Sequence, residues 1–141
     1  MIEIKDDIWK YKDQGYIVIP TNGYVKGNGQ CVMGRGLAFQ CAHRYPSIPL
    51  ALGHQICATG NHVYEFVHPL KMFSFPVKHN WWEKADYQLI ERSVKELRTI
   101  VGIRQDKIFI PHVGCGNGQL NWPEVYQLIA GLDQRFMVVD R

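Results

Sequence analysis

Two glycine-rich segments, each lying between an apolar β-rich run and a helical pattern, most constrain the fold of this sequence. The first holds five glycines between Thr21 and Gly36 and follows the run from Tyr16 to Pro20. The second, Gly114 to Gly118, follows the run from Lys107 to Val113. Open α/β sheets bind ligands at such strand-to-helix loops, because bare backbone N–H groups and a helix N-terminus favour an anion. The pattern therefore predicts an α/β fold in which two loops could clamp one diphosphate.

Hydrophobic periodicity predicts the other elements. The clearest is a helix from Ala85 to Val101, in which apolar residues recur at three- and four-residue steps between charged ones. Strands are predicted at Ile2 to Ile4, His62 to Val67, Met72 to Val77 and Arg135 to Asp140, and helices at Leu37 to Tyr45, Ser47 to Ala58 and Trp122 to Leu132. The second and third of these strands would form a hairpin, and Pro49 and Gly53 interrupt the second helix. Alternating strands and helices favour a sheet with helices on both faces.

The length and composition indicate one globular domain. The chain has 141 residues, 46% of them hydrophobic and 21% charged, so we expect a single domain over residues 1–141 and no disordered or coiled-coil chain. No apolar run approaches the roughly 18 residues of a membrane span, and the charged N-terminus is unlike a secretory signal. We therefore expect a cytosolic protein without a membrane partner. The net charge of +3 is a mild attraction for phosphates, far from a polybasic nucleic-acid footprint.

Several motifs of other functional classes are absent from the sequence. The four cysteines form no CxxC pair and no zinc-finger spacing, so we expect reduced thiols and no metal. A Walker lysine and a GxSxG elbow are also missing, which leaves nucleoside-triphosphate hydrolysis and serine esterase chemistry without support. Each glycine-rich loop is a weak signal alone, because such clusters more often form ordinary turns.

The order of several short motifs resembles that of the macrodomain family. They are KDDI at residues 5–8, IVIPTN at 17–22, VMGRGLA at 32–38, FPVKH at 75–79, PHVGCG at 111–116 and LNW at 120–122. The last three look like the branch of DarG-type and TARG1-type ADP-ribosyl hydrolases, and the match spans most of the chain. The resemblance implies a three-layer α/β/α sandwich with a central mixed sheet, which binds ADP-ribose in a cleft at the strand ends.

The resemblance also implies roles for individual residues. Lys78 would act on C1″ of the distal ribose through a Schiff base, which requires a neutral amine and therefore a pKa lowered by burial. Asp7 would accept a hydrogen bond from the adenine amino group, and Asn22 would contact the distal ribose. The simpler alternatives are an exposed lysine, a helix-capping acid and a turn asparagine. The further ligand-binding residues implied are Ile8, Met33, Gly34, Gly36, Val113, Gly114, Cys115, Gly116, Asn117 and Gly118.

One position departs from the pattern of the TARG1-type proteins. Their second loop carries an acidic residue where Gly118 stands here, so a general acid must be sought in His79, Glu83 or a water molecule. The sequence thus predicts an ADP-ribosyl hydrolase that removes ADP-ribose from DNA or protein without another cofactor. The alternative is a non-catalytic binder of ADP-ribose or a related nucleotide signal, and a phosphatase of ADP-ribose-1″-phosphate is less favoured.

Three features near these motifs have no assigned role. Trp81 and Trp82 could stack on a base, although adjacent tryptophans more often divide between core and surface. The stretch from Gly23 to Gln30 is unusually long and could cover the distal ribose or contact an attached substrate. Arg35 is expected to be solvated.

Overall fold

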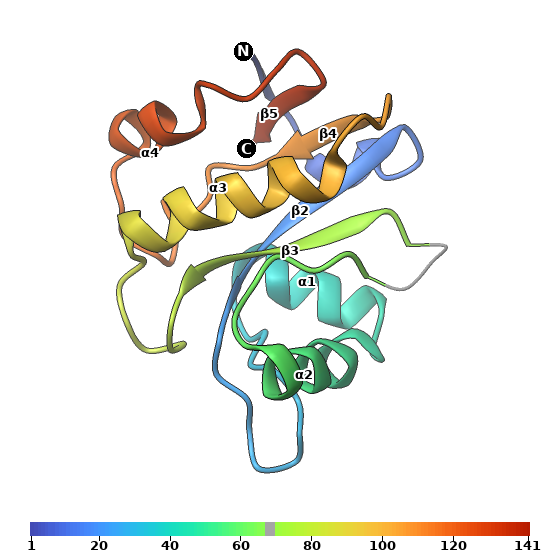
Figure 1. The fold of residues 1–141 in the computed structure, drawn as a ribbon, viewed down its shortest axis with the longest axis vertical. Helices are drawn as coiled ribbons and strands as arrows, with labels where there is room; N and C mark the ends of the chain where they lie inside the picture. Colours follow the sequence, from blue (N-terminus) through green and yellow to red (C-terminus); the bar gives the residue numbers. More distant parts are fainter. Residues whose placement is uncertain (67–69) are drawn as a thin grey trace.

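The computed structural model describes residues 1–66 and 70–141, in which one sheet lies between two layers of helices (Figure 1). Its elements are β1 (Ile2–Lys5), the 3-10 helix η1 (Ile8–Tyr11), β2 (Gly15–Asn22), α1 (Gly36–Arg44), α2 (Ile48–Thr59), β3 (Met72–Lys78), α3 (Tyr87–Val101), β4 (Lys107–Ile110), α4 (Trp122–Ile129) and β5 (Phe136–Asp140). The strand order is β1-β5-β4-β2-β3, and every pairing is parallel. The α/β class and the three layers are confirmed, whereas the mixed sheet implied by the resemblance is wrong for these five strands.

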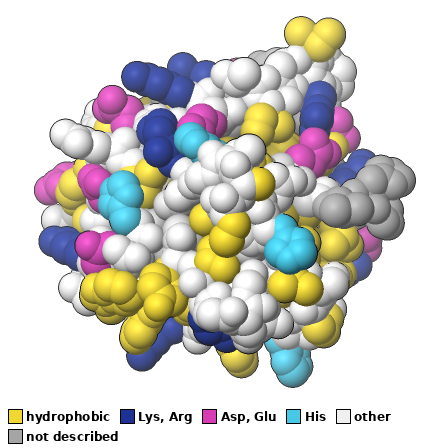
Figure 2. Space-filling view, turned by 60° about the horizontal axis from the view of Figure 1, so that its bottom comes forward, with side chains coloured by type: hydrophobic (Ala, Val, Ile, Leu, Met, Phe, Trp, Pro, Cys, Tyr) yellow, Lys and Arg dark blue, Asp and Glu magenta, His cyan; other side chains and the backbone are white. Residues whose placement is uncertain are grey.

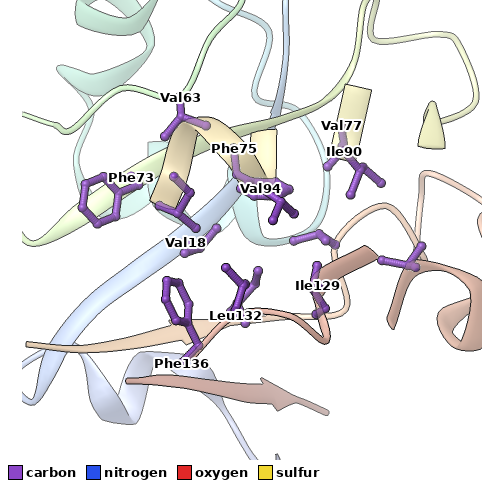
Figure 3. Packing of buried hydrophobic residues seen from close by; sticks show 14 of the residues in the cluster. Val18, Val63, Phe73, Phe75, Val77, Ile90, Val94, Ile129, Leu132 and Phe136 are labelled. Carbon is purple, nitrogen blue, oxygen red and sulfur yellow. The ribbon is translucent and has the colours of Figure 1, made fainter. Parts of the chain in front are cut away.

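A separate apolar cluster covers each face of the sheet. Figure 3 shows the first cluster, in which Val94 of α3 lies near Phe75 of β3, Ile90 of α3 near Val77 of β3, and Leu132 near Phe136 of β5. The second cluster packs η1, α1 and α2 onto the opposite face, and its buried members include Ile8, Trp9, Ile17, Ile19, Ile48, Leu52, Phe66 and Phe109. Because successive side chains of a strand point to opposite faces, a strand buried on both sides reads as the continuous apolar run seen in β2.

Helix α3 forms as its sequence predicts, with its start two residues later. The Asp86 side chain caps the helix by accepting a hydrogen bond from the Gln88 backbone N–H at 2.9 Å, and Gly102 ends it. The apolar stripe faces the sheet, and its predicted members are all buried: Leu89, Ile90, Val94, Leu97 and Val101. Burial of each such side chain stabilises the fold by roughly 1.5–3 kcal/mol.

Helix α2 is more regular than predicted. Pro49 lies in its first turn, where the missing N–H would have no helical partner in any case. Gly53 lies in a buried part of the helix, and a Cβ there would overlap the carbonyl oxygen of Gly29. The predicted interruption is therefore wrong, and Gly53 instead lets the chain after β2 pack closely on α2.

The predicted hairpin at residues 62–77 forms only in part. Strand β3 is present, but residues 62–66 make a single antiparallel bridge, between Glu65 and Phe73, instead of a strand. The Tyr64 N–H donates to the Ser74 hydroxyl at 2.9 Å, so a side chain interrupts the backbone ladder at this point. Residue 67 of the predicted strand and the turn around residue 69 lie outside the described residues.

Two elements end earlier than their patterns predict. Strand β4 stops at Ile110, because Pro111 has no N–H to continue the ladder. Helix α4 stops at Ile129, two residues before Gly131. None of the helices described in the structure is long and apolar enough to cross a membrane.

Candidate functional site

A cavity of about 660 Å³ opens where the strands of the sheet end, with Asn22 of β2, Lys78 of β3 and Asp140 of β5 in its lining. The topology explains its place. The chain after β2 continues to α1 on one face of the sheet, and the chain after the neighbouring β4 continues to α4 on the other, so the two connections diverge and leave a crevice. The volume lies within the roughly 300–1,000 Å³ of small-molecule sites. Figure 2 is turned so that the bottom of Figure 1, with the chain after β2, comes forward.

The first loop, residues 23–35, is folded back on itself. An antiparallel bridge joins Val25 to Cys31, and the Cys31 N–H donates to the Pro49 carbonyl at 2.9 Å. The Asn22 amide closes the base of the loop, because its Nδ2 donates to the Val32 carbonyl at 2.8 Å and its Oδ1 accepts from the Tyr24 N–H at 2.9 Å. A ribose contact by Asn22 therefore has to use the remaining N–H and lone pair of this amide.

The second loop, residues 111–121, packs tightly against the start of α3. Gly114 has a φ of 75°, and a Cβ at this position would approach Ile90 Cδ1 to 2.8 Å. A Cβ at Gly118 would overlap the Gly114 carbonyl oxygen and approach the Ala85 Cβ to 2.8 Å. No side chain fits at position 118 with this backbone, which explains structurally why the acid of the TARG1-type proteins has no counterpart at this place.

Gly34 of the first loop and Gly116 of the second have the opposite surroundings. Both line the cavity, and among the described residues no atom beyond the glycine itself and its two chain neighbours lies within 4 Å of where a Cβ would stand. The space in front of them is open, so a ligand can approach the backbone there.

Lys78, at the end of β3, is buried, with 7% of its surface exposed. Its Nζ donates to the carbonyl oxygens of Trp81, at 3.3 Å, and Asn117, at 3.5 Å, and no carboxylate of the described residues forms an ion pair with it. Burial lowers the pKa of the Lys78 amine, and the positive charge of Arg35 lowers it further. Both effects make the neutral, nucleophilic form of this amine easier to reach than it is for an ordinary lysine.

Curated proteins share sequence with this chain, although no model of a known protein family matches it. The DNA ADP-ribosyl glycohydrolase of Thermus aquaticus is 33% identical over 108 residues, and that of Mycobacterium tuberculosis is 28% identical over 119 residues. The matches cover 70% and 77% of this chain, but only 30% and 34% of the relatives. The chain therefore spans about a third of the length of these relatives.

The fold was compared with solved structures as well. The macrodomain of Mycobacterium tuberculosis DarG gives a TM-score of 0.79 at 20% identity, and the macrodomain of Thermus aquaticus DarG gives 0.76 at 24%. In both, 99% of this chain matches 97% of the other. The chain has the macrodomain fold. Thermosipho africanus DarTG in complex with ADP-ribose has a TM-score of 0.74 at 17% identity, over 99% of this chain and 41% of that one.

The macrodomain brings most of the predicted site residues together around one cavity. Those that line it are Asn22, Met33, Gly34, Gly36, Lys78, Gly114, Gly116, Asn117 and Gly118. Ile8 and Val113 are buried outside the lining, and Cys115 Sγ lies 3.4 Å from the Val113 carbonyl oxygen. Their assignment as ligand contacts stays a prediction.

Asp7 also lies outside the cavity lining of the macrodomain. Its side chain caps η1 by accepting from the Trp9 N–H at 3.1 Å, and its other oxygen pairs with Arg141 at 3.0 Å. The structure thus places Asp7 in the capping role that was the simpler alternative, and the adenine contact stays a prediction.

Neither protein group proposed as the general acid reaches the cavity of the macrodomain. His79 Nε2 pairs with Asp86 at 3.0 Å, and Glu83 accepts from Asn80 at 2.9 Å. Neither side chain is among the described residues that line the cavity. The identity of the general acid stays a prediction.

The sequence analysis did not predict that the lining of the cavity carries an excess of positive charge. Lys26, Arg35 and Lys78 line the cavity, and Asp140 is the carboxylate among the described lining residues. Arg35 is exposed, as expected, and its charge also acts on Lys78. Its position between Gly34 and Gly36, directly before α1, is the sequence signal that could have found it. The excess of positive charge favours an anionic ligand.

Proposed function

We propose that this macrodomain binds ADP-ribose in the cavity and removes it from a modified macromolecule, with DNA as the favoured acceptor. The observation that carries the proposal is the buried Lys78 amine, which opens into a positively charged cavity between two loops of exposed backbone. Two names among the relatives support it: the curated relatives are DNA ADP-ribosyl glycohydrolases, and a protein with the same fold was solved with ADP-ribose.

The two loops fit the diphosphate of ADP-ribose. The first leads into the N-terminus of α1, where backbone N–H groups lack helical partners and the helix dipole favours negative charge. Gly34 and Gly116 leave the space in which an anion can approach the backbone. Arg35 and Lys26 supply charge from the same wall of the cavity. The diphosphate would lie between these groups, with the distal ribose directed towards Asn22 and Lys78.

The chemistry follows from the neutral amine of Lys78. Its nitrogen forms a bond to C1″ of the distal ribose as the bond from C1″ to the acceptor breaks. One amine proton goes to the departing acceptor by way of water, the other goes to the ring oxygen as the sugar opens, and a Schiff base remains. Water then adds to this C=N bond, which restores the amine and releases ADP-ribose as its aldehyde, free to close again.

A non-catalytic ADP-ribose binder is the second candidate. It is favoured by one observation: position 118 of the second loop has no room for an acid. Such a protein would use the same cavity for binding and would not turn over an ADP-ribosylated substrate.

The experiment measures binding and release in the same protein. ADP-ribose is titrated into the wild-type protein by calorimetry, and release is then followed from single-stranded DNA that is ADP-ribosylated on a thymidine base. We expect Lys78→Ala to bind ADP-ribose within a few-fold of wild type and to lose release by about a hundredfold or more, because it removes a group that forms a bond during the reaction. Lys71→Ala is the matched control, since Lys71 is an exposed lysine before the same strand.

Three results would change the proposal. Absence of binding at micromolar protein contradicts the assignment of the cavity to ADP-ribose. Release that does not depend on Lys78 contradicts the role of the lysine. Binding without release from either modified DNA or modified protein establishes the second candidate.

A further inference from the structure

Three aromatic side chains form one cluster on the surface beside the cavity: Tyr24, Trp81 and Trp82. The Trp82 ring lies 5.4 Å from Tyr24 and 5.6 Å from Trp81 between ring centres, edge to face with both. Trp81 and Trp82 keep 47% and 59% of their surfaces exposed. Clustered exposed aromatic rings on a soluble domain mark a surface that contacts something else.

The aromatic cluster begins at the reacting end of the cavity. Tyr24 and Trp81 belong to its lining, and the Trp81 carbonyl accepts the hydrogen bond from Lys78 Nζ at 3.3 Å. Trp82 lies outside the lining and extends the cluster away from the cavity. In the proposed reaction the acceptor departs from the carbon that Lys78 attacks, so the acceptor lies on the side of these rings.

Hydrogen bonds hold both backbones that carry the aromatic cluster. On the first loop, the Tyr24 carbonyl accepts from the Val32 N–H at 3.0 Å. On the segment after β3, the Glu83 N–H donates to the Asn80 carbonyl at 3.2 Å, and the Ala85 N–H donates to the Gly118 carbonyl at 2.9 Å. The backbone that carries the rings is therefore ordered before an acceptor arrives, which reduces the entropy lost on binding.

The charge around the aromatic cluster restricts the class of acceptor. Lys26 and Arg35 line the same cavity as Tyr24 and Trp81, which combines cations with flat apolar faces. Figure 2, which looks at this end of the molecule, shows hydrophobic patches on a surface that also carries lysine or arginine side chains. Single-stranded nucleic acids are bound in this way, by aromatic rings that stack on bases and by cations along the phosphates.

We propose that the cluster of Tyr24, Trp81 and Trp82 stacks on the nucleobases of a single-stranded nucleic acid next to the ADP-ribosylated nucleotide. This inference rests on the proposed function and specifies its acceptor. A protein acceptor offers no regular series of flat bases and phosphates to such a surface. From sequence, base stacking was one of two alternatives for the paired tryptophans, and contact with an attached substrate was one of two for the long first loop; this proposal joins the two.

The test uses Trp82→Ala, because Trp82 lies outside the cavity lining and the hydrogen bonds of Lys78 Nζ go to Trp81 and Asn117 instead. Binding of an unmodified, fluorescently labelled single-stranded oligothymidine is followed by anisotropy. We expect Trp82→Ala to weaken this binding by about tenfold, and Trp82→Phe to retain most of it, because stacking requires a flat ring. Phe39→Ala is the matched control, since Phe39 is an exposed aromatic on α1 that stacks on His43 and lies outside the cluster.

Kinetics separate this inference from the proposed function. With an ADP-ribosylated oligonucleotide we expect Trp82→Ala to raise KM and leave kcat unchanged, and with an ADP-ribosylated single nucleoside we expect neither constant to change. Equal effects on both substrates, no effect on either, or a loss confined to an ADP-ribosylated protein would overturn the inference while the proposed function stands. If the wild-type protein releases no ADP-ribose, the proposed function fails, and oligothymidine binding alone still decides whether the cluster stacks on bases.

Discussion

The two glycine-rich loops of this macrodomain look alike in sequence and differ in what their glycines do. In the first loop, Gly34 faces open space in the cavity. In the second, a Cβ at Gly114 would clash with the Ile90 side chain, and a Cβ at Gly118 would clash with the Gly114 backbone and the Ala85 side chain. Gly34 thus leaves space for a ligand beside the first loop. Gly114 and Gly118 mainly allow the second loop to pack closely against the rest of the protein.

The loops also act differently on Lys78. The first places the Arg35 charge near the amine and so lowers its pKa. The second offers a backbone carbonyl, from Asn117, at 3.5 Å. Substitutions should therefore affect stability, binding and pH dependence according to the loop in which they lie.

The largest effect is expected for Gly118→Asp, which introduces the kind of side chain that TARG1-type proteins carry. The new Cβ overlaps the Gly114 carbonyl, so we expect the free energy of unfolding to fall by about 3 kcal/mol, measured by urea denaturation. Gly116→Asp is the control at an open position and should stay within about 0.5 kcal/mol of wild type. A stable Gly118→Asp protein with faster release would contradict the packing role of this glycine.

Gly34→Ala should separate binding from stability. Its methyl group would stand in the open cavity, so we expect ADP-ribose affinity to fall by about tenfold in calorimetry, which corresponds to the roughly 1–3 kcal/mol of one misplaced methyl group. The free energy of unfolding should change by less than about 0.5 kcal/mol. Gly27→Ala is the matched control, because it is equally open but lies outside the cavity lining. Equal ADP-ribose affinity of Gly34→Ala and Gly27→Ala would contradict the role of Gly34 in leaving space for the ligand.

The pH dependence of release should move with Arg35. Only the neutral Lys78 amine reacts, so kcat/KM should rise with pH and level off at a lower pH than an ordinary lysine would give, because the pKa is lowered. Arg35→Gln removes a cause of that lowering, raises the pKa of Lys78 and shifts the rise to higher pH. Lys26→Gln removes a cavity charge that has no such effect on Lys78, and its midpoint should stay in place. A midpoint that Arg35→Gln leaves unchanged or lowers would contradict the role of the first loop.

The smallest effect is expected for Asn117→Ala. The second loop reaches Lys78 through the backbone carbonyl of Asn117, which the substitution retains. The pH profile of release should therefore match that of wild type, with rates within about twofold. A shifted midpoint would mean that the Asn117 side chain contributes to the site in a way that the backbone contact does not explain.

The sequence was sufficient for the elements whose determinants are local. Helix α3 has a capping Asp86 and an apolar stripe of period 3.6, and β2 is a continuous apolar run, so both were predictable. The two loops were also predictable as the site, because each stands between a strand and a helix.

What the sequence did not provide depends on contacts between distant residues. The clash at Gly118 comes from Ala85 and Gly114, and the regularity of α2 comes from the approach of Gly53 to Gly29. The capping role of Asp7 was one of two open alternatives, which pattern alone could not separate. The pairing of Tyr24 with Trp82 joins two loops that follow different strands, and no local pattern encodes it.

The most direct test of the central claim is to trap the bond between Lys78 and the sugar. The protein is incubated with ADP-ribosylated DNA in the presence of cyanoborohydride, which reduces a Schiff base to a stable amine, and its peptides are analysed by mass spectrometry. We predict an ADP-ribose adduct on Lys78, absent from Lys78→Ala and from a reaction without reductant. Release of ADP-ribose at the wild-type rate with no adduct on Lys78, or with the adduct on another lysine, would contradict the account.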